Sequence, residues 1–353
     1  MTSKQLQNAF ARWSGAGMSL VLASVFETEG STYSKAGARM LITADGDFQG
    51  MLSGGCLEGD LAERARAVLA SGAPQSVTYD LGQDDEELWG LGVGCDGLMR
   101  IFLQPLTPGN QYEPFAAMCL AYAGQAEQIA ATVLDSDVDE LAAGASLVTV
   151  AGDVAYNDIS DTWLPQIQAE AGAALRQGQS LTGTLRTAAG QANILYAILR
   201  PPPRILVLGA GLDAEPVVRL ACELGWRVTV QDHRPAYIES GDFSAADAVH
   251  CVPVGEVAAK LDLQRFAAAV VMSHHLASDR QYLRQLALSD IEYIGLLGPR
   301  DRRVRLLQEL GEFADKLTPR LHGPAGLDIG GRGPASIALS IVAEIHQQLM
   351  RAD

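Results

Sequence analysis

The 353-residue chain is short of positive charge, because its 26 lysine and arginine residues stand against 42 aspartate and glutamate residues, a formal net charge of −16. A chain so acidic repels the phosphates of nucleic acids and the surfaces of anionic membranes. We therefore exclude nucleic acid and membrane as its main partners. A small anion can still be held where local cations and backbone amides outweigh the overall field.

Cysteine is also scarce. There are five cysteines and no CxxC pair. They are Cys56, Cys95, Cys119, Cys222 and Cys251. An odd number at wide spacing excludes a disulfide framework and a zinc ligand pattern, and it indicates a reducing compartment. The apolar surroundings of the last three predict that these pack in the core.

Long hydrophobic runs are absent too. The apolar run Met18–Phe26 is too short to span a bilayer. It leads into Glu27 and Glu29 without the small-residue cleavage site of a signal peptide. We therefore expect a soluble, cytoplasmic protein.

A proline-rich segment divides the chain. In "RPPPRILVLGAG", residues 200–211, three consecutive prolines cannot continue a helix or a central strand, so they serve as a stiff linker. Domains typically contain about 100–200 residues. We expect an N-terminal domain over residues 1–200 and a C-terminal domain over residues 201–353.

The two halves differ in the order of their predicted elements. In the first half strands come in runs, which favours a mixed α+β domain. In the second half short apolar strands alternate with helices, an order typical of a doubly wound parallel sheet. The predicted strands of the first half are 20–28, 38–43, 49–52, 76–80, 98–105, 130–134, 146–150, 181–186 and 192–199, with helices over 58–71, 114–123 and 159–177. Those of the second half are 204–208, 227–231, 249–253, 267–273 and 293–297, with helices over 213–224, 279–287, 300–310 and 334–350.

The start of the second half carries a dinucleotide-type glycine turn. Gly209, Gly211 and Ala214 fill the G-x-G-x-x-G/A positions between a strand and a helix, and Asp232 follows about twenty residues later. Gly209 permits the tight turn, Gly211 lets amides approach a phosphate, and Asp232 is placed to accept hydrogen bonds from a ribose. The pattern indicates a Rossmann-like fold and predicts a site for NAD or another nucleotide. The alternative is a turn kept for packing alone, since Asp213 would face the phosphate.

A histidine pair ends a later strand of the same half, in "VVMSHHLASD", residues 270–279. Ligands bind at the carboxyl ends of parallel strands, so His274 is a candidate ligand contact. The alternative is a hydrogen-bonded turn capped by Ser278.

Two glycine–cysteine turns mark the first half. In "LSGGCLEGD" Cys56 precedes a predicted helix whose dipole favours the thiolate, and Gly54 and Gly55 can present amides to an anion. In "GLGVGCDG" Gly94 and Gly97 surround Cys95. The alternative is that each thiol is a small buried hydrophobic group beside a tight turn.

Upstream, "EGSTYSKAGARMLI" supplies two cations, Lys35 and Arg39, beside glycines. Both are candidate contacts for a phosphate. The alternative is an ordinary hairpin with a charged rim.

Taken together, these motifs resemble the XdhC/CoxI family, maturation factors for molybdenum hydroxylases such as xanthine dehydrogenase, aldehyde oxidoreductase and CO dehydrogenase. The resemblance covers nearly the whole chain. It rests on "TEGSTYSKAGARMLI", "LSGGCLEGD", "GVGCDGLMRIFLQPL", "VLGAGLDAEPVVRLACELGWRVTVQDHRPAY", "VVMSHHLASDRQYL", "YIGLLGPRDRR" and "GPAGLDIGGRGPASIALSIVAEI".

The resemblance implies a chaperone rather than a turnover enzyme. Such proteins bind the molybdenum cofactor, protect it while a cysteine desulfurase supplies its sulfido ligand, and help to insert it into the apo molybdenum hydroxylase. On this interpretation Cys56 and Cys95 line the site near molybdenum or relay sulfur.

Two other functions compete with this interpretation. An NAD-dependent oxidoreductase is favoured by the Gly209-to-Asp232 pattern, but all six histidines lie at or beyond His233, which leaves the first half without a clear acid–base group. A redox- or NAD-sensing module would use Cys56 and Cys95 as sensors. The amphipathic C-terminal helix over residues 334–350 makes a homodimer plausible.

Overall fold

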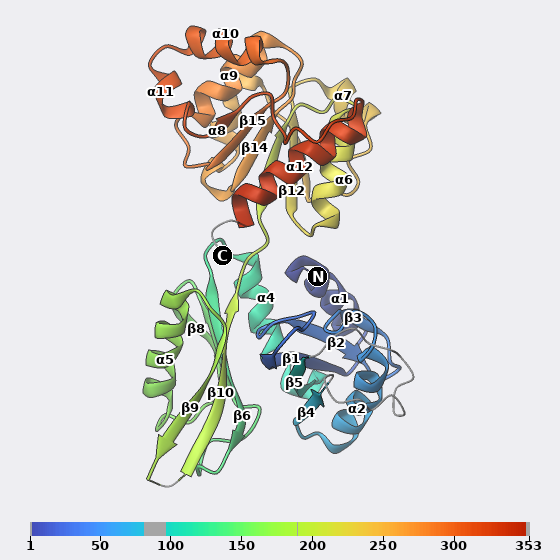
Figure 1. The fold of residues 1–353 in the computed structure, drawn as a ribbon, viewed down its shortest axis with the longest axis vertical. Helices are drawn as coiled ribbons and strands as arrows, with labels where there is room; N and C mark the ends of the chain where they lie inside the picture. The colour runs from blue at the N-terminus through green and yellow to red at the C-terminus, as the bar shows by residue number, and fades with distance from the viewer. Residues whose placement is uncertain (1, 81–96, 189, 351–353) are drawn as a thin grey trace. The chain divides into compact units, whose positions relative to one another are not determined.

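The computed structural model describes residues 2–80, 97–188 and 190–350, and the chain forms two compact units, Met1–Pro201 and Pro202–Asp353 (Figure 1). The first unit is built on two five-stranded sheets, with strand orders β3-β2-β1-β5-β4 and β8-β7-β6-β10-β9, in which every pair is antiparallel. Its helices are α1 (Ser3–Gly15), α2 (Glu58–Ser71), α4 (Phe115–Ala123) and α5 (Leu164–Gln177). Its strands are β1 (Leu20–Glu29), β2 (Arg39–Thr43), β3 (Phe48–Gly50), β4 (Gln75–Asp80), β5 (Leu98–Leu106), β6 (Gln128–Ser136), β7 (Ser146–Val150), β8 (Asp153–Asn157), β9 (Leu181–Thr187) and β10 (Gly190–Leu199).

Both faces of the first sheet are covered. Successive residues of a strand point to opposite faces, so the continuous apolar run Leu20–Ala23 at the start of β1 needs a partner on each face. Val21 and Ala23 of β1 pack with Leu61 of α2, whereas Leu20 and Leu22 pack with α1 and α4. The loop that joins β3 to α2 is thereby held at the edge of a fully packed sheet.

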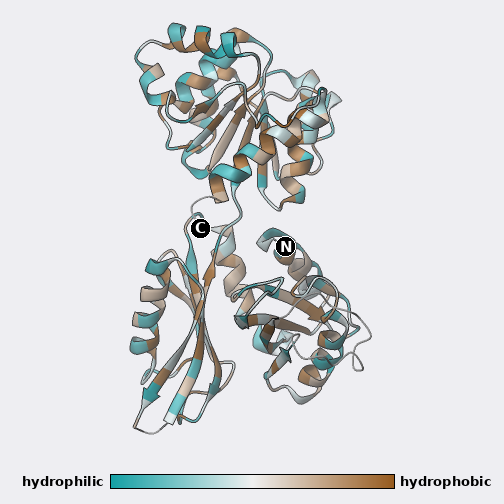
Figure 2. Cartoon of the chain, viewed as in Figure 1, coloured by the Kyte–Doolittle hydropathy of each residue, from teal (hydrophilic) through white to brown (hydrophobic). Residues whose placement is uncertain are grey.

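The second sheet packs α5 on one face and the core around α4 on the other. Ile129 of β6 and Ile194 of β10 contact the α5 side, while Ala130 and Leu199 join the core that includes α4. The strands of this sheet are largely brown in Figure 2, and α5 is teal on its outer side, as burial of one helix face requires.

The second unit is one six-stranded parallel sheet of order β13-β12-β11-β14-β15-β16. Its strands are β11 (Arg204–Leu208), β12 (Arg227–Asp232), β13 (Ala248–Cys251), β14 (Ala268–Val271), β15 (Tyr293–Leu296) and β16 (Leu321–His322). Its helices are α6 (Ala214–Glu223), α7 (Pro235–Ser240), α8 (Val257–Lys260), α9 (Leu276–Leu286), α10 (Arg300–Leu310), α11 (Phe313–Leu317) and α12 (Pro334–Met350). Helices α6 and α12 cover one face, and α9 to α11 cover the other. The order reverses between β11 and β14, as in the doubly wound folds that bind nucleotides.

The predicted fold class, a Rossmann-like parallel sheet after a mixed α+β domain, is thus confirmed. Several elements differ in detail. The predicted helix 159–177 begins only at Leu164, because Ile159 is buried in a turn before it and Asn157 hydrogen bonds across that turn. Sequence reasoning predicts neither strands β8 and β16 nor helices α1, α7, α8 and α11. The expectation that Cys251 packs in the core is wrong, since Cys251 is exposed at the end of edge strand β13.

Among the described residues, no helix has both the length and the apolar character needed to cross a membrane.

Candidate functional site

Three segments that the sequence singles out meet at one end of the first sheet. Residues 29–35, residues 51–58 and Gly97 form what we call the loop cluster. The Tyr33 ring lies 3.5 Å from where a Cβ on Gly54 would stand, and Ser34 Oγ donates to the Met51 carbonyl at 3.3 Å. A Cβ on Gly97 would lie 2.5 Å from the Ser31 carbonyl oxygen. Glycine at 97 therefore lets the start of β5 approach the 29–32 backbone closely.

The carboxylate of Glu58 organises this cluster. Its Oε1 accepts from the amides of Leu52 and Ser53, both at 3.0 Å, and its Oε2 accepts from Ser53 Oγ at 2.5 Å and from the Gly55 amide at 3.0 Å. The side chain is 2% exposed. Burial alone would raise its pKa, but the hydrogen bonds from Ser53 and Leu52 outweigh it and hold the pKa below its usual value. Glu58 is therefore an anion that the loop already binds.

Sequence reasoning missed this role of Glu58. The signal was present as a carboxylate in the first turn of α2, shortly after Ser53 and the two glycines. Helix α2 begins at Glu58, and its entry is fixed by the Leu57 amide, which donates to Ser53 Oγ at 2.8 Å. Because the Gly55 amide is taken by Glu58, it is not directed at a ligand in this structure.

Cys56 lies two residues before α2, directly after the two glycines of the loop. Gly54 and Gly55 have φ of +81° and +113°, a region that favours glycine. No atom stands within 4 Å of the position of a Cβ on Gly55, so this side of the loop is open. Cys56 itself is half-buried against the α2 side of the sheet. Cys95 and Gly94 lie outside the described residues, so the expected pairing of the two cysteine turns stays a prediction.

The two predicted cations are separated by the sheet. Lys35 is exposed and its Nζ donates to Thr32 Oγ1 at 3.3 Å within the loop cluster. Arg39 is 8% exposed, and its Nη1 donates to the Tyr122 hydroxyl of α4 at 2.9 Å. The guanidinium thus points to the α4 face, opposite to the face that Cys56 contacts. Lys35 and Cys56 share the cluster, and Arg39 does not.

In the second unit, the glycine turn after β11 has the geometry that its spacing predicts. Gly209 has a φ of +124°, and a Cβ there would lie 2.5 Å from the Met272 carbonyl oxygen. The turn therefore packs directly on the backbone at the end of β14, which brings residues 209–213 and 272–275 together. Gly211 is crowded by Asp213, whose Oδ1 would be 2.7 Å from a Cβ.

Asp232 is occupied by protein groups. It is fully buried, its Oδ2 accepts from the Ala210 amide at 2.8 Å, and Arg234 binds both oxygens through Nε at 2.9 Å and Nη2 at 2.8 Å. Burial would raise its pKa, but Arg234 and the Ala210 amide lower it below the usual range. Sequence reasoning missed Arg234 as the partner of this acid. A carboxylate with these partners holds the turn and is not directed at a ribose.

His274 lies beside the glycine turn, with its ring 3.7 Å from the position of a Cβ on Gly211. Its Nε2 lies 2.8 Å from Asp213 Oδ2, its φ is +58°, and its side chain is 59% exposed. A strained backbone at an exposed histidine suggests a positioned group. The Asp213 carboxylate beside it opposes an approaching phosphate. The neighbouring His275 instead caps α9, because its Nδ1 accepts from the Ser278 amide at 3.3 Å.

A buried ion pair between Asp279 and Arg302 holds the loop that follows β14. Asp279 accepts from Ser273 Oγ at 2.5 Å through Oδ1, and its Oδ2 accepts from Arg302 Nε at 3.0 Å. Arg302 belongs to the "GLLGPRDRR" segment. The pair fixes the 273–279 loop and so the direction of His274.

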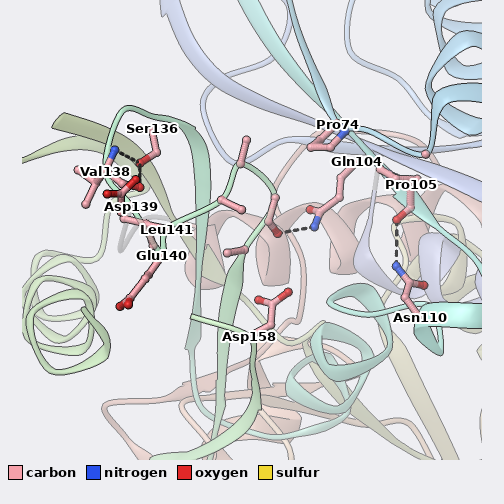
Figure 3. A pocket seen from close by; sticks show the side chains of 15 residues that line it. Pro74, Gln104, Pro105, Asn110, Ser136, Val138, Asp139, Glu140, Leu141 and Asp158 are labelled. Atoms are coloured by element: carbon pink, nitrogen blue, oxygen red, sulfur yellow. Dashed lines mark hydrogen bonds between the residues drawn. The ribbon is translucent and has the colours of Figure 1, made fainter. Parts of the chain in front are cut away.

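A cavity of about 730 Å³ opens in the first unit, away from the loop cluster (Figure 3). Gln104 crosses it, with Nε2 donating to the Gly144 carbonyl at 2.7 Å, and Asp139, Glu140 and Asp158 line it. None of the predicted site residues borders it, and its acidic lining does not suit a phosphate. Among the described residues, no cluster of three or more His, Cys, Asp and Glu side chains is arranged to hold a metal ion.

Comparison with known proteins matches both units. The profile of the XdhC and CoxI family matches residues 13–80, and that of the XdhC Rossmann domain matches residues 205–345. A Bacillus subtilis protein, named as a probable subunit of xanthine dehydrogenase, is 31% identical over 94% of this chain and 93% of its own length. The Escherichia coli "Molybdenum cofactor insertion chaperone PaoD" is 23% identical over 94% of this chain and 83% of its own length.

A solved structure is similar over the whole chain. It is described as a xanthine dehydrogenase from Bacillus halodurans and is 28% identical, with a TM-score of 0.78 over 100% of this chain and 97% of that one. On the strength of the full-length relative and the two matched profiles, the chain belongs to the XdhC and CoxI family.

Proposed function

We propose that this protein is a maturation chaperone that binds the molybdenum cofactor as cargo and delivers it to an apo molybdenum hydroxylase. Two lines support the proposal. The family includes a relative named as a molybdenum cofactor insertion chaperone and another named as part of a xanthine dehydrogenase. The observation that carries it in this chain is the loop cluster, where a thiol, an exposed amine and an open glycine turn converge.

The loop cluster suits a phosphorylated cargo in specific ways. Lys35 supplies an exposed cation for the phosphate tail, and the open side of Gly55 leaves room for a group to approach the backbone. Cys56, on the adjacent residue, offers a soft ligand or a sulfur-relay group beside the cargo. Gly54 and Gly97 give the cluster its shape, because a side chain at either position would meet the 29–33 segment.

Cargo delivery implies two partners. A molybdenum hydroxylase receives the cofactor, and a cysteine desulfurase supplies its sulfido ligand before insertion. We infer that Cys56, with Cys95, stands where that sulfur arrives. The relatives' names support a molybdenum hydroxylase as a partner, and the desulfurase is part of the proposal.

The second unit does not fit a dinucleotide in the usual way. Asp232 is bonded to Arg234, and Asp213 places negative charge where a pyrophosphate would sit. Gly211 and His274 remain candidate contacts for part of the cargo. We therefore expect titration with NAD to give no saturable heat, whereas the cofactor itself is retained. Saturable NAD binding would favour the oxidoreductase or sensor interpretation instead.

The test is cargo retention. The protein is purified from cells that synthesise the molybdenum cofactor, the sample is oxidised, and pterin fluorescence per mole of chain is measured. Cys56→Ser and Cys95→Ser are compared with Cys251→Ser, a matched control because Cys251 is exposed in the other unit. We expect pterin in the wild type and in the control, and a loss of pterin or of hydroxylase activation in the first two variants.

Two results would reject the proposal. One is the absence of pterin from the wild type, and the other is unchanged pterin and unchanged hydroxylase activation in both cysteine variants.

A homodimer also belongs to the proposal. Leu339 of α12 is 53% exposed, although Ile341 and Ile345 of the same helix are buried, so α12 has an apolar residue available for a second copy. Light scattering after gel filtration tests this directly.

A further inference from the structure

A basic pocket lies at the amino-terminal edge of the parallel sheet in the second unit. Its volume is about 510 Å³, inside the range of roughly 300–1,000 Å³ typical of small-molecule sites. Six charged residues line it, namely Arg204, Arg227, Lys260, Arg265, Asp247 and Asp262.

The fold itself gathers these cations. Arg204 opens β11 and Arg227 opens β12, and the two are direct partners in the parallel register, so both side chains leave the same face of the sheet. Lys260 ends α8, and Arg265 ends the short 3₁₀ helix Leu263–Arg265 on that face. The glycine turn at Gly209 follows the opposite, carboxyl end of β11. The basic pocket is therefore separate from the site described above.

The lining of the pocket holds more cations than carboxylates. Four cations stand against two carboxylates, in a chain whose net charge is −16. Asp247 Oδ2 also accepts from the Val228 amide at 2.8 Å, and Asp262 Oδ1 accepts from the Gln264 amide at 3.3 Å. Burial lowers the pKa of Arg204, and repulsion from Arg227 and Arg265 lowers it further, with Asp247 opposing the change. Like charges this close repel one another, and a bound anion would reduce that repulsion.

We propose that this pocket binds a small phosphorylated molecule, with a phosphate group between Arg204, Arg227 and Arg265. Guanidinium groups suit phosphate because their planar donors match its oxygens in pairs. A concave site of this volume suits a small ligand. Phe266 also lines the pocket and offers an apolar surface to an organic phosphate. The inference is independent of the proposed function.

Calorimetric titration of the full chain with inorganic pyrophosphate and with ADP tests the proposal. We expect saturable binding of one or both, weakened by added salt. Arg227→Gln and Arg265→Gln should each weaken binding about tenfold or more, because each removes a charge-assisted contact. Arg284→Gln is the matched control, since Arg284 is exposed on α9 outside the pocket and should leave binding within about twofold.

Arg265 is exposed, so its variant should fold, and thermal unfolding without ligand verifies this. Binding of pyrophosphate alone would support an inorganic ligand, and tighter binding of ADP would support an organic one. The proposal fails if neither probe saturates at millimolar concentration, or if Arg284→Gln weakens binding as much as the pocket variants. It also fails if only a polyglutamate peptide binds, because the surface would then serve an acidic protein partner.

Discussion

Single buried carboxylates determine the shape of both glycine-rich regions. Glu58 binds three amides and a hydroxyl of the loop cluster, and Asp232 binds Arg234 and the turn amide of Ala210. Sequence reasoning assigned Asp232 to a ribose and missed the role of Glu58. The reason is that residue spacing predicts proximity, whereas the partner of a carboxylate depends on the path of a loop that only the three-dimensional structure reveals.

Replacing Glu58 by glutamine should destabilise the first unit. One acceptor oxygen is lost and an amide donor is brought against Ser53 and Gly55, so we expect a loss of about 2–3 kcal/mol in the free energy of unfolding. Urea unfolding of Glu58→Gln measures it. The matched control is Glu63→Gln, because Glu63 is 81% exposed on the same helix, 3.9 Å from Arg66. Equal effects in the two variants would contradict the assigned role of Glu58.

The effect of Glu58 should depend on pH. Its pKa in the folded state is lowered from the usual value of 4.5, so the carboxylate stabilises the fold above that value and the contribution disappears as pH falls through the lowered pKa. The difference in unfolding free energy between the wild type and Glu58→Gln should therefore be full near about pH 7 and shrink progressively below pH 4.5. A difference that stayed constant across that interval would show that the charge is not responsible.

Lys35 and Arg39, the two predicted cations of the first half, should affect different properties, namely pterin retention and stability. Lys35→Gln removes an exposed amine of the loop cluster, so pterin retention should fall while stability changes by less than about 0.5 kcal/mol. Tyr122→Phe removes the buried partner of Arg39, so the unfolding free energy should fall by about 1–3 kcal/mol with pterin retention unchanged. Urea unfolding and pterin fluorescence are measured on both variants. If Tyr122→Phe instead lost pterin at full stability, Arg39 would be a binding residue after all.

At the scale of elements, the sequence predicts best those strands that helices cover on both faces. The strands predicted at 204–208 and 293–297 match β11 and β15 closely, because strands covered by helices on both faces are continuous apolar runs. Prediction failed at exposed edges. Strand β8 has mostly exposed side chains and no apolar alternation, so its pairing with β7 leaves little trace in the sequence. Helix α1 was missed although Leu6, Ala9 and Trp13 have helical spacing.

The turn between β11 and α6 gives an element-scale prediction. Gly209→Ala places a Cβ 2.5 Å from the Met272 carbonyl oxygen at a φ of +124°, so neither the turn nor β14 can remain where it is. We expect a loss of about 3 kcal/mol or more, from strain and steric overlap together. Gly311→Ala is the control, because Gly311 also has a positive φ, +57°, but no atom within 4 Å of its Cβ position.

Gly311→Ala should cost only about 1–2 kcal/mol. The difference between the two variants isolates the close approach of the turn to β14. Chemical denaturation followed by the fluorescence of buried Trp226 in the same unit measures both. Similar losses in the two variants would mean that the Gly209 turn relaxes and that its packing on β14 is not required.

At the scale of the whole molecule, each unit has its own hydrophobic cores. Among the described residues, the clusters around β11 to β15 contain only residues beyond 204, and those of the two antiparallel sheets contain only residues before 200. A destabilising change in one core therefore has no shared side chain through which to reach the other. In the sequence, the three prolines at 201–203 stand between these two sets of residues.

Hydrogen exchange followed by mass spectrometry should show this independence. Glu58→Gln should raise amide exchange in peptides from the first unit and leave those from the second unchanged, and Gly209→Ala should do the reverse. In the double variant the two exchange patterns should superimpose, with free-energy changes that add within about 0.5 kcal/mol. Faster exchange across residues 205–345 in Glu58→Gln would instead reveal energetic coupling, and a cargo site in the first unit would then be able to signal its occupancy to the parallel sheet.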